Sequence, residues 1–451
     1  MQRALVLPPE YHHFQRKDRY LFIDPRNFIW FSTDRLGKLI VESLAIRGLL
    51  RDAMDVVLEE SGREVSSDSA LTYVDRFIRG LLNIGFIHSG EYVLREDLPR
   101  EQLPNPVVMY LHLSNGCNLR CPYCYNQEHR LGSTKERKAN NGVAPAPRLE
   151  NFLRLIDQAS DLGFREVKLT GGEALLNKNA MLIARYAKHK GLFVNLLTNA
   201  TLISPKLAQE IVASVDVVSV SLDSKSPDDH DAIRGRGTHR KVLLAIQLLR
   251  QAGLKQLHIN GVITPTTLNS VKELLAFAWD DMSASNVTIS GSALQVSDPD
   301  DRWGAAAQML NDEQYAGLDD RTAEFYRERT KTTQAPGYRN QCGVGNGVLS
   351  VDSNGDIYPC QTLHERDFLC GNAFNDGLKH VIETSVVLRD ARHATVDKIE
   401  ECNVCPVRYI CASGCRSEAY TREGGMLKRN KALCPTFYKR AVNELWNSVS
   451  G

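Results

Sequence analysis

Three cysteines fall within eight residues in the stretch Ser114-Asn115-Gly116-Cys117-Asn118-Leu119-Arg120-Cys121-Pro122-Tyr123-Cys124. The residues before them, Val107–Ser114, are predicted to form a β-strand. Three thiolates on one short loop can hold three irons of a [4Fe–4S] cube and leave the fourth iron open to a small molecule. A structural zinc ion is the alternative, and it would require a fourth ligand such as His112 or His129.

Outward from this loop, strand patterns alternate with helical patterns. Strands are predicted at Val107–Ser114, Glu166–Thr170, Leu192–Thr198, Val217–Leu222, Gln256–Thr264 and Asn286–Ile289. Repeated strand–helix units indicate an α/β fold with a parallel sheet, and six units are too few for a complete eight-stranded barrel. We therefore expect a partial (β/α)6 barrel over residues 107–300 and a bridging helical segment over 301–340. The cysteine loop lies at the carboxyl end of the first strand, where parallel folds place their chemistry.

The CxxxCxxC spacing, with an aromatic residue before the last cysteine, resembles the signature of the radical S-adenosylmethionine (AdoMet) superfamily. The resemblance implies that Cys117, Cys121 and Cys124 hold a catalytic [4Fe–4S] cluster whose open iron binds AdoMet. It also implies that Tyr123 lies beside the cofactor. In this superfamily AdoMet cleavage gives a 5′-deoxyadenosyl radical that takes a hydrogen from the substrate, so the cofactor carries the difficult chemistry.

Further residues at the predicted strand ends resemble the AdoMet contacts of the superfamily. The motif Thr170-Gly171-Gly172-Glu173 would let the backbone approach the ligand closely, and Glu173 could accept from its ammonium group. Asn199 and Ser221 match positions near the ribose and the methionine moiety, although helix capping is an equally good reading of each. Arg234 is expected to meet the AdoMet carboxylate. No catalytic acid or base is identified.

The C-terminal third holds the remaining eight cysteines, and seven of them follow the pattern of the SPASM domain, which we expect over residues 341–451. The resemblance implies two auxiliary [4Fe–4S] clusters. One would be held by Cys402, Cys405, Cys411 and Cys434, and the other by Cys342, Cys360 and Cys415. A zinc ribbon would explain a single CxxC pair but not this order of seven ligands.

The set of Cys342, Cys360 and Cys415 is here called the first auxiliary set, and the other four cysteines are called the second auxiliary set. The first auxiliary set has three cysteines and lacks a fourth ligand. Pro336 stands where related proteins carry a further cysteine. The first auxiliary cluster is therefore expected to keep an open iron or to take Cys370 as its fourth ligand. The alternative for Cys370 is a small buried side chain.

Residues 1–97 are predicted to form a separate unit of two short strands, Tyr20–Asp24 and Asn27–Phe31, three helices and a hairpin-like wing, and the segment Ser32-Thr33-Asp34 could cap the first helix. This layout resembles the winged-helix-like recognition element of enzymes that mature ribosomally made peptides, which binds a leader peptide as an added strand. A DNA-binding winged helix is the alternative. The acidic residues Asp52, Asp55, Glu59 and Glu60 argue against it, and we expect no nucleic-acid partner.

Composition limits the remaining possibilities. The chain has 451 residues, a formal net charge of +1 and 11 cysteines, none before Cys117. Clustered cysteines without a signal peptide or membrane span predict a cytoplasmic metalloprotein. The whole layout resembles the subtilosin-type maturases, so we expect hydrogen abstraction from a precursor peptide that forms a thioether or a carbon–carbon crosslink. A flavodoxin or ferredoxin would supply electrons. A radical enzyme acting on a protein or small molecule, or a zinc-binding regulator, is the alternative.

Overall fold

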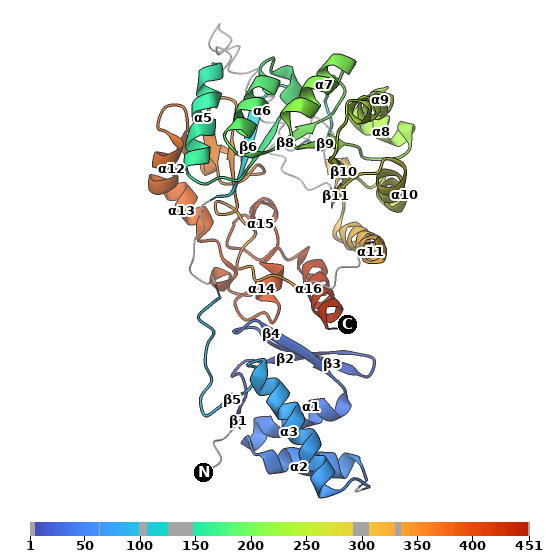
Figure 1. Ribbon diagram of the computed structural model, residues 1–451, viewed down its shortest axis with the longest axis vertical. Helices are drawn as coiled ribbons and strands as arrows, with labels where there is room; N and C mark the ends of the chain where they lie inside the picture. Colours follow the sequence, from blue (N-terminus) through green and yellow to red (C-terminus); the bar gives the residue numbers. More distant parts are fainter. Residues whose placement is uncertain are drawn as a thin grey trace.

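A computed structural model describes residues 5–62, 64–98, 106–124, 148–291, 306–329 and 335–449. An N-terminal module lies at one end of the elongated molecule and an α/β sheet with its helices at the other, and the cysteine-rich C-terminal part lies between them (Figure 1). Across the described ranges, no helix combines the length and the apolar character needed to cross a membrane.

The α/β part is built on six parallel strands that follow one another in chain order. They are β6 (Val108–Ser114), β7 (Glu166–Gly171), β8 (Phe193–Thr198), β9 (Val217–Ser221), β10 (Leu257–Ile263) and β11 (Asn286–Gly291). Each predicted strand is confirmed to within two residues at either end. Their buried apolar side chains alternate along each strand, as a sheet covered by helices on one face requires.

Helices on that face complete the apolar core (Figure 1). They are α5 (Leu149–Asp161), α6 (Ala180–His189), α7 (Pro205–Ser214), α9 (Thr238–Gln251) and α10 (Val271–Ala276). Helix α8 (Pro227–Arg234) precedes α9 and contributes no residue to this core. Phe152, Ile183 and Leu249 are fully or almost fully buried against the strands. The opposite face of the sheet carries polar side chains such as Tyr110 and Lys168, whose Oη and Nζ atoms lie 3.4 Å apart.

The prediction of a six-stranded sheet was incomplete. Strand β12 (Val348–Val351) of the C-terminal part pairs in parallel with β6, and β13 (Asp356–Tyr358) and β14 (Gly371–Asn372) continue the sheet in antiparallel fashion. The result is one nine-stranded sheet. Two regions that the cysteine patterns separate therefore share a continuous hydrogen-bonded structure.

The rest of the C-terminal part consists of short helices. They are α12 (Leu378–Thr384), α13 (Val386–Arg392), α14 (Arg408–Cys411), α15 (Arg416–Glu423) and α16 (Cys434–Ser448). The predicted bridging segment contains α11 (Asp312–Arg329). An ion pair between Asp319 and Arg440 joins α11 to α16.

The N-terminal module contains a three-stranded sheet and three helices. The strands are β2 (His12–Arg16), β3 (Arg19–Asp24) and β4 (Ile29–Thr33), in the order β2-β3-β4, and the helices are α1 (Arg35–Arg47), α2 (Leu50–Glu60) and α3 (Ser67–Asn83). Asp34 caps α1, as predicted, by accepting a hydrogen bond from the Gly37 amide at 2.8 Å. The predicted hairpin-like wing is instead a pairing of β1 (Leu5–Val6) with β5 (His88–Ser89).

The module packs against the C-terminal part through a shared apolar cluster. Its buried members are Leu21, Ile23, Val407, Ile410, Ala441, Leu445 and Trp446. The indole Nε1 of Trp30 also donates to the Ser448 hydroxyl at 2.9 Å. One face of the small sheet is therefore buried on α14 and α16, whereas its other face packs on the helices of the module.

Candidate active site and metal centres

The cysteine loop after β6 is fixed against the Gly-Gly-Glu motif by backbone contacts. The amide of Gly172 donates to the Ser114 carbonyl at 2.8 Å, and the amide of Glu173 donates to the Gly116 carbonyl at 2.9 Å. A side chain at position 172 would place its Cβ atom 2.2 Å from the Gly116 oxygen. The close approach of the two loops therefore requires glycine.

Cys117, Cys121 and Cys124 are near enough to affect one another electrostatically. Burial raises the pKa of Cys121 to about 11; Arg234 opposes this rise, and the thiolates of Cys124 and Cys117 add to it. A thiol in this setting stays protonated at neutral pH unless a metal displaces its proton. The environment therefore fits three ligands of one metal cluster.

Glu173 is nearly fully buried and joins the ends of two strands. Its Oε1 atom accepts from the Thr198 hydroxyl at 2.7 Å and its Oε2 atom accepts from the Asn199 amide at 2.8 Å. Burial raises the pKa of Glu173, while these hydrogen bonds and the charge of Arg234 work in the opposite direction. The carboxylate is thus already held by the protein, and its predicted contact with AdoMet stays a prediction.

Asn199 reaches from the end of β8 to the cysteine loop. Its Nδ2 atom donates to the Asn118 Oδ1 atom at 2.9 Å and lies 3.8 Å from Cys117 Sγ. Ser221 ends β9 at the same edge of the sheet, in register with Asn260. The sheet edge therefore brings Asn199 directly to the cysteines, and it places Ser221 along the same row of strand ends.

Asp223 belongs to the segment Ser221-Leu222-Asp223, which the sequence places at the end of the fourth strand and which resembles the positions near the ribose and the methionine moiety. Its buried carboxylate accepts from Arg234 Nε at 2.6 Å, from Arg234 Nη2 at 2.9 Å and from the Val262 amide at 2.9 Å. It also accepts a short hydrogen bond from the Tyr123 hydroxyl.

The same hydrogen-bond network fixes the position and the charge partner of Arg234. Burial favours the neutral acid, but the charge and hydrogen bonds of Arg234 outweigh it and hold the pKa of Asp223 below its ordinary value. Two nitrogens of the guanidinium are committed to this carboxylate, and the guanidinium carbon lies 5.7 Å from the centre of the Tyr123 ring. Arg234 and Tyr123 therefore meet at Asp223, and the predicted contact of Arg234 with the AdoMet carboxylate stays a prediction.

The four cysteines of the second auxiliary set lie around one cavity of about 170 Å³. Burial raises the pKa of Cys411 to about 11, and Cys405, Cys434 and Cys402 add to the rise. Cys402 Sγ also lies 3.2 Å from the Ser413 hydroxyl. The set is therefore assembled around a common space, as four ligands of one cluster must be.

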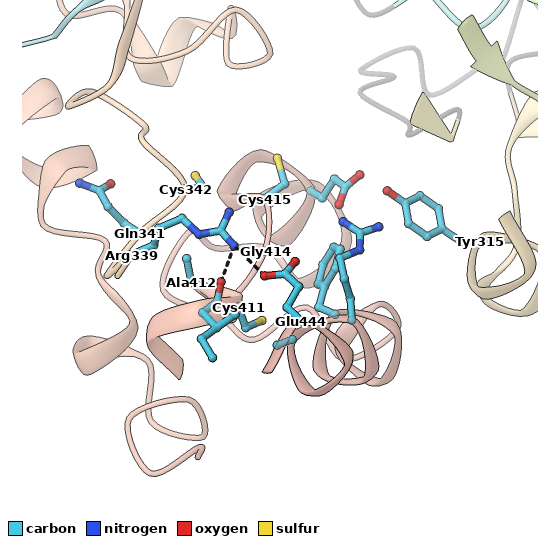
Figure 2. Close-up of a pocket in the computed structure, with 14 residues that line it drawn as sticks. Tyr315, Arg339, Gln341, Cys342, Cys411, Ala412, Gly414, Cys415 and Glu444 are labelled. Carbon is cyan, nitrogen blue, oxygen red and sulfur yellow. Dashed lines mark hydrogen bonds and ion pairs between the residues drawn. The ribbon is translucent and has the colours of Figure 1, made fainter. Parts of the chain in front are cut away.

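Cys342 and Cys415 of the first auxiliary set line a larger cavity of about 320 Å³, which Cys411 of the second set also lines and Cys360 does not. Figure 2 shows Cys342 and Cys415 on one side of it, with Tyr315 across the cavity and the Arg339–Glu444 ion pair near them (Nη2 to Oε2, 3.9 Å). Burial raises the pKa of Cys415 to about 12, with further contributions from Cys342 and Cys360. These three cysteines therefore form one group.

Cys370 is placed apart from this group. Burial raises its pKa to about 12, and Ser385 and Arg392 oppose the rise; no other cysteine contributes. Its thiol donates to the Phe368 carbonyl at 3.4 Å, and its side chain packs on the main apolar core. The structure therefore supports a small buried side chain and gives no support to Cys370 as the fourth ligand.

The positions of the possible metal ligands can be compared with those that a structural zinc site requires. Within the described ranges, no three Cys, His, Asp or Glu side chains converge on a position that a single metal ion could occupy. The cysteines are gathered around wider spaces, and a cube with one thiolate on each iron needs such spacing. Of the two extra ligands considered for zinc, His129 lies outside the described residues. His112 packs against His364, with ring centroids 4.6 Å apart.

Comparison with known proteins agrees with this site. Residues 111–278 match the model of the Radical SAM superfamily, and residues 342–406 match that of the SPASM iron–sulfur cluster-binding domain. The chain therefore contains a radical SAM domain and a SPASM iron–sulfur domain, and the cofactors of these domains are AdoMet and [4Fe–4S] clusters.

Particular relatives can also be named. The chain is 28% identical over 348 residues to the AdoMet-dependent heme synthase of Methanosarcina barkeri, which covers 72% of this chain and 95% of that protein. It is 26% identical over 326 residues to the mycofactocin maturase MftC of Mycolicibacterium smegmatis, which covers 70% and 80%.

Solved structures share the fold. SuiB of Streptococcus suis, solved bound to its precursor peptide SuiA, has a TM-score of 0.57 at 16% identity and covers 95% of this chain and 99% of its own. The anSMEcpe structure with bound AdoMet has a TM-score of 0.57 at 20% identity and covers 76% and 93%.

Proposed function

We propose that this enzyme modifies a ribosomally made precursor peptide by hydrogen abstraction, and that residues 1–97 bind the leader of that peptide. The observation that carries the proposal is the N-terminal module, whose small sheet has free edges and whose one face is built into the cluster-bearing part. The neighbour that covers 95% of this chain, and therefore includes a counterpart of the module, was solved with a precursor peptide. MftC, by its name, is also a maturase.

The leader is proposed to add as a strand to β4. In the described residues both β2 and β4 pair only with β3, so each has an outer edge open to a further strand. Helix α3 lies beside β4, because the rings of Phe31 and Phe77 meet edge to face at 6.4 Å. Burial and then the charge of Asp34 raise the pKa of Tyr73, which places that hydroxyl near the end of β4. Strand edge and aromatic side chains together suit an extended apolar peptide.

When bound to the enzyme, the [4Fe–4S] cluster and AdoMet supply the radical that removes a hydrogen atom. The chain's own contribution is to hold the cysteine loop, to bury the Asp223–Arg234 pair beside it, and to offer a polar sheet face to the peptide. Lys168 and Tyr110 lie on this face, where Lys168 Nζ is 5.1 Å from the centre of the Tyr110 ring. The bond formed, whether a thioether or a carbon–carbon crosslink, depends on the peptide. A flavodoxin or ferredoxin is the proposed electron donor.

Gln361 limits the range of activities. Sulfatase-maturating enzymes carry an aspartate base directly after the corresponding auxiliary cysteine, and this chain has Gln361 after Cys360. The amide oxygen of Gln361 accepts from the Cys360 thiol at 3.3 Å. A glutamine cannot serve as that base, so oxidation of a sulfatase is not proposed.

The experiment is leader binding by variants of α3. Tyr73 and Leu71 are 39% and 40% exposed, and they flank the buried stripe of α3 on opposite sides. Tyr73→Glu is expected to weaken binding of a fluorescent leader peptide at least tenfold and to reduce peptide modification, whereas Leu71→Glu retains both. Equal leader binding by the two variants would refute the proposed binding site at the edge of β4 beside α3. Candidate leaders come from short reading frames beside the gene.

A small-molecule substrate is the second candidate function. It is favoured by the similarity to the heme synthase, which covers 72% of this chain. If the enzyme consumed AdoMet with an iron porphyrin and left every neighbouring peptide unmodified, this second function would replace the first.

A further inference from the structure

Among the described residues, Arg416 is the largest side chain that is completely buried. It follows Cys415 and begins α15. Its Nη1 atom donates to the carbonyls of Met426 (2.9 Å) and Lys428 (3.0 Å), and its Nη2 atom donates to the Ser413 hydroxyl (2.8 Å). The Nε atom is buried and has no hydrogen-bond acceptor among the described residues. One N–H donor of the buried guanidinium is thus without an acceptor among the described residues.

The guanidinium lies between the two auxiliary sets of cysteines. On one side it is adjacent in the chain to Cys415. On the other side it contacts the Ser413 hydroxyl, which lies 3.2 Å from Cys402 Sγ. Burial lowers the pKa of Arg416, and thiolates from both sets counter this effect; in order of size they are Cys342, Cys402, Cys415 and Cys411. A single cation therefore faces both cluster sites.

Among the described residues, Arg416 forms no ion pair with a carboxylate, and its acceptors are carbonyl and hydroxyl oxygens. Burial raises the pKa of the Glu418 carboxyl, and the charges of Arg422 and then Arg416 oppose the rise, but Glu418 lies beyond ion-pair distance of Arg416. A buried charge without a counter-charge costs several kcal/mol, and a guanidinium does not lose its proton to escape that cost. Anionic groups must therefore neutralise it, and thiolate-bound clusters on either side provide such groups.

We propose that Arg416 is a shared counter-charge of the two auxiliary clusters, which raises the reduction potentials of both and donates a hydrogen bond through Nε to a cluster sulfur. Net charge, hydrogen bonds to sulfur and exclusion of solvent are the features that set such potentials. The guanidinium is held in a buried site by four oxygen acceptors, which are the carbonyls of Met426, Lys428 and Ser413 and the Ser413 hydroxyl. Its field therefore reaches both clusters with little screening. Arg416 is in this sense a positioning and tuning residue that need not touch the substrate.

The test is a redox titration, followed by electron paramagnetic resonance, of anaerobically reconstituted full-length enzyme. Arg416→Met removes the charge, and Arg416→Lys retains it but lacks Nε. Arg392→Met is the control, since Arg392 is a half-buried arginine of the same part of the chain that lies near Cys370 alone of the cysteines. Iron content is measured for each variant.

Arg416→Met is expected to shift both auxiliary potentials to more negative values while the potential of the cluster on Cys117, Cys121 and Cys124 stays unchanged. Arg416→Lys is expected to retain most of the wild-type potentials, and Arg392→Met all of them. If Arg416→Met loses both auxiliary clusters but keeps the catalytic one, and Arg416→Lys keeps all three, the shared role is also supported.

The proposal is overturned if all clusters are present and no potential moves, if only one auxiliary cluster responds, or if Arg392→Met has the same effect. It rests on the cluster assignment above, and failure of that assignment is distinguishable. A wild-type enzyme that binds only about four irons instead of roughly eleven to twelve would contradict the auxiliary clusters themselves.

Discussion

Glu10 and Arg408 form an ion pair between the N-terminal module and the cluster-bearing part, with Glu10 Oε1 accepting from Arg408 Nη1 at 3.0 Å. The same Nη1 atom donates to the Cys405 carbonyl at 3.0 Å. The Arg408 side chain is only 5% exposed, whereas Glu10 is 25% exposed. The proposed leader-binding module is thus connected by one side chain to the backbone of a predicted cluster ligand.

Glu10→Gln is expected to destabilise this interface by about 1–3 kcal/mol, because it leaves the Arg408 charge buried without its partner. The measurement is the urea midpoint of iron-loaded enzyme, followed by the fluorescence of Trp30 and Trp446 at the interface. Asp75→Asn, which affects an exposed pair with Arg79 on α3, is the control and should leave the midpoint unchanged. Equal midpoints for wild type and Glu10→Gln would contradict a stabilising pair.

The difference in stability between the wild type and Glu10→Gln is expected to depend on pH, because Glu10 has a shifted pKa. Burial favours the neutral acid, but the hydrogen bond and charge of Arg408 outweigh it and hold the pKa of Glu10 below its ordinary value. A lowered pKa means that the pair stabilises the folded enzyme fully above the unfolded pKa of about 4.3, and that this contribution is lost as the pH falls below it. The wild-type and Glu10→Gln stabilities should therefore converge on acidification. A gap that widened below that pH would contradict the assignment.

Asp223→Asn is expected to weaken AdoMet binding at least tenfold, because Arg234 then carries an unpaired buried charge and Tyr123 loses its acceptor. Equilibrium dialysis of anaerobic enzyme measures the binding. The double variant Asp223→Asn with Arg234→Met removes both charges and should recover folding stability without recovering affinity. Wild-type affinity in a folded Asp223→Asn enzyme would show that the network has no part in the site.

Single cysteine variants should separate ligands from the buried thiol. Cys121→Ala is expected to lose about four of roughly twelve irons and all AdoMet cleavage, and Cys405→Ala to lose about four irons from the second auxiliary set. Cys370→Ala should retain the full iron content. Loss of iron from Cys370→Ala would restore it as a ligand, and full AdoMet cleavage by Cys121→Ala would refute the radical assignment.

Gly172→Ala is expected to displace the cysteine loop, since its Cβ would lie 2.2 Å from the Gly116 oxygen and 2.9 Å from the Cys117 amide nitrogen. Both neighbours are backbone atoms that cannot rotate away. The expected result is loss of AdoMet binding and of the cluster signal. Gly80→Ala is the control, because no atom lies within 4 Å of its added Cβ and alanine favours a helix. Normal AdoMet binding by Gly172→Ala would contradict the close approach of the two loops.

Local patterns predicted much of this structure. The six parallel strands, the Asp34 cap and the helices of the module follow from periodicity and capping, which depend on neighbours in sequence. The pairing of β12 with β6 depends on residues about 240 positions apart, and nothing local to either strand specifies it. Strand β2 was missed because the segment His12–Arg16 is polar and its main apolar neighbour, Phe22, lies on β3.

In the functional site, too, local patterns predicted some features and missed those that depend on distant residues. Cysteine spacing identified the groups that gather in space, because the chain itself carries that spacing. Asp223 and Arg234 both lie in segments that resemble AdoMet-contacting positions, but the sequence did not predict that they pair with each other across 11 positions. The isolation of Cys370 could not be foreseen either, because the spacing of a cysteine does not reveal which core its side chain enters.

The register of β12 on β6, from Val348 opposite Val108 to Val351 opposite Leu111, fixes how the parts of this enzyme could be exchanged. The loop that carries Cys117 and the turn that leads to Cys360 extend from strands of one sheet, so their separation is set by strand spacing rather than by a flexible tether. In a chimaera that joined this barrel to a SPASM domain from a relative, the relative's strand would have to pair with β6 in the same register. Electron transfer between the clusters of the two parts would depend on that pairing.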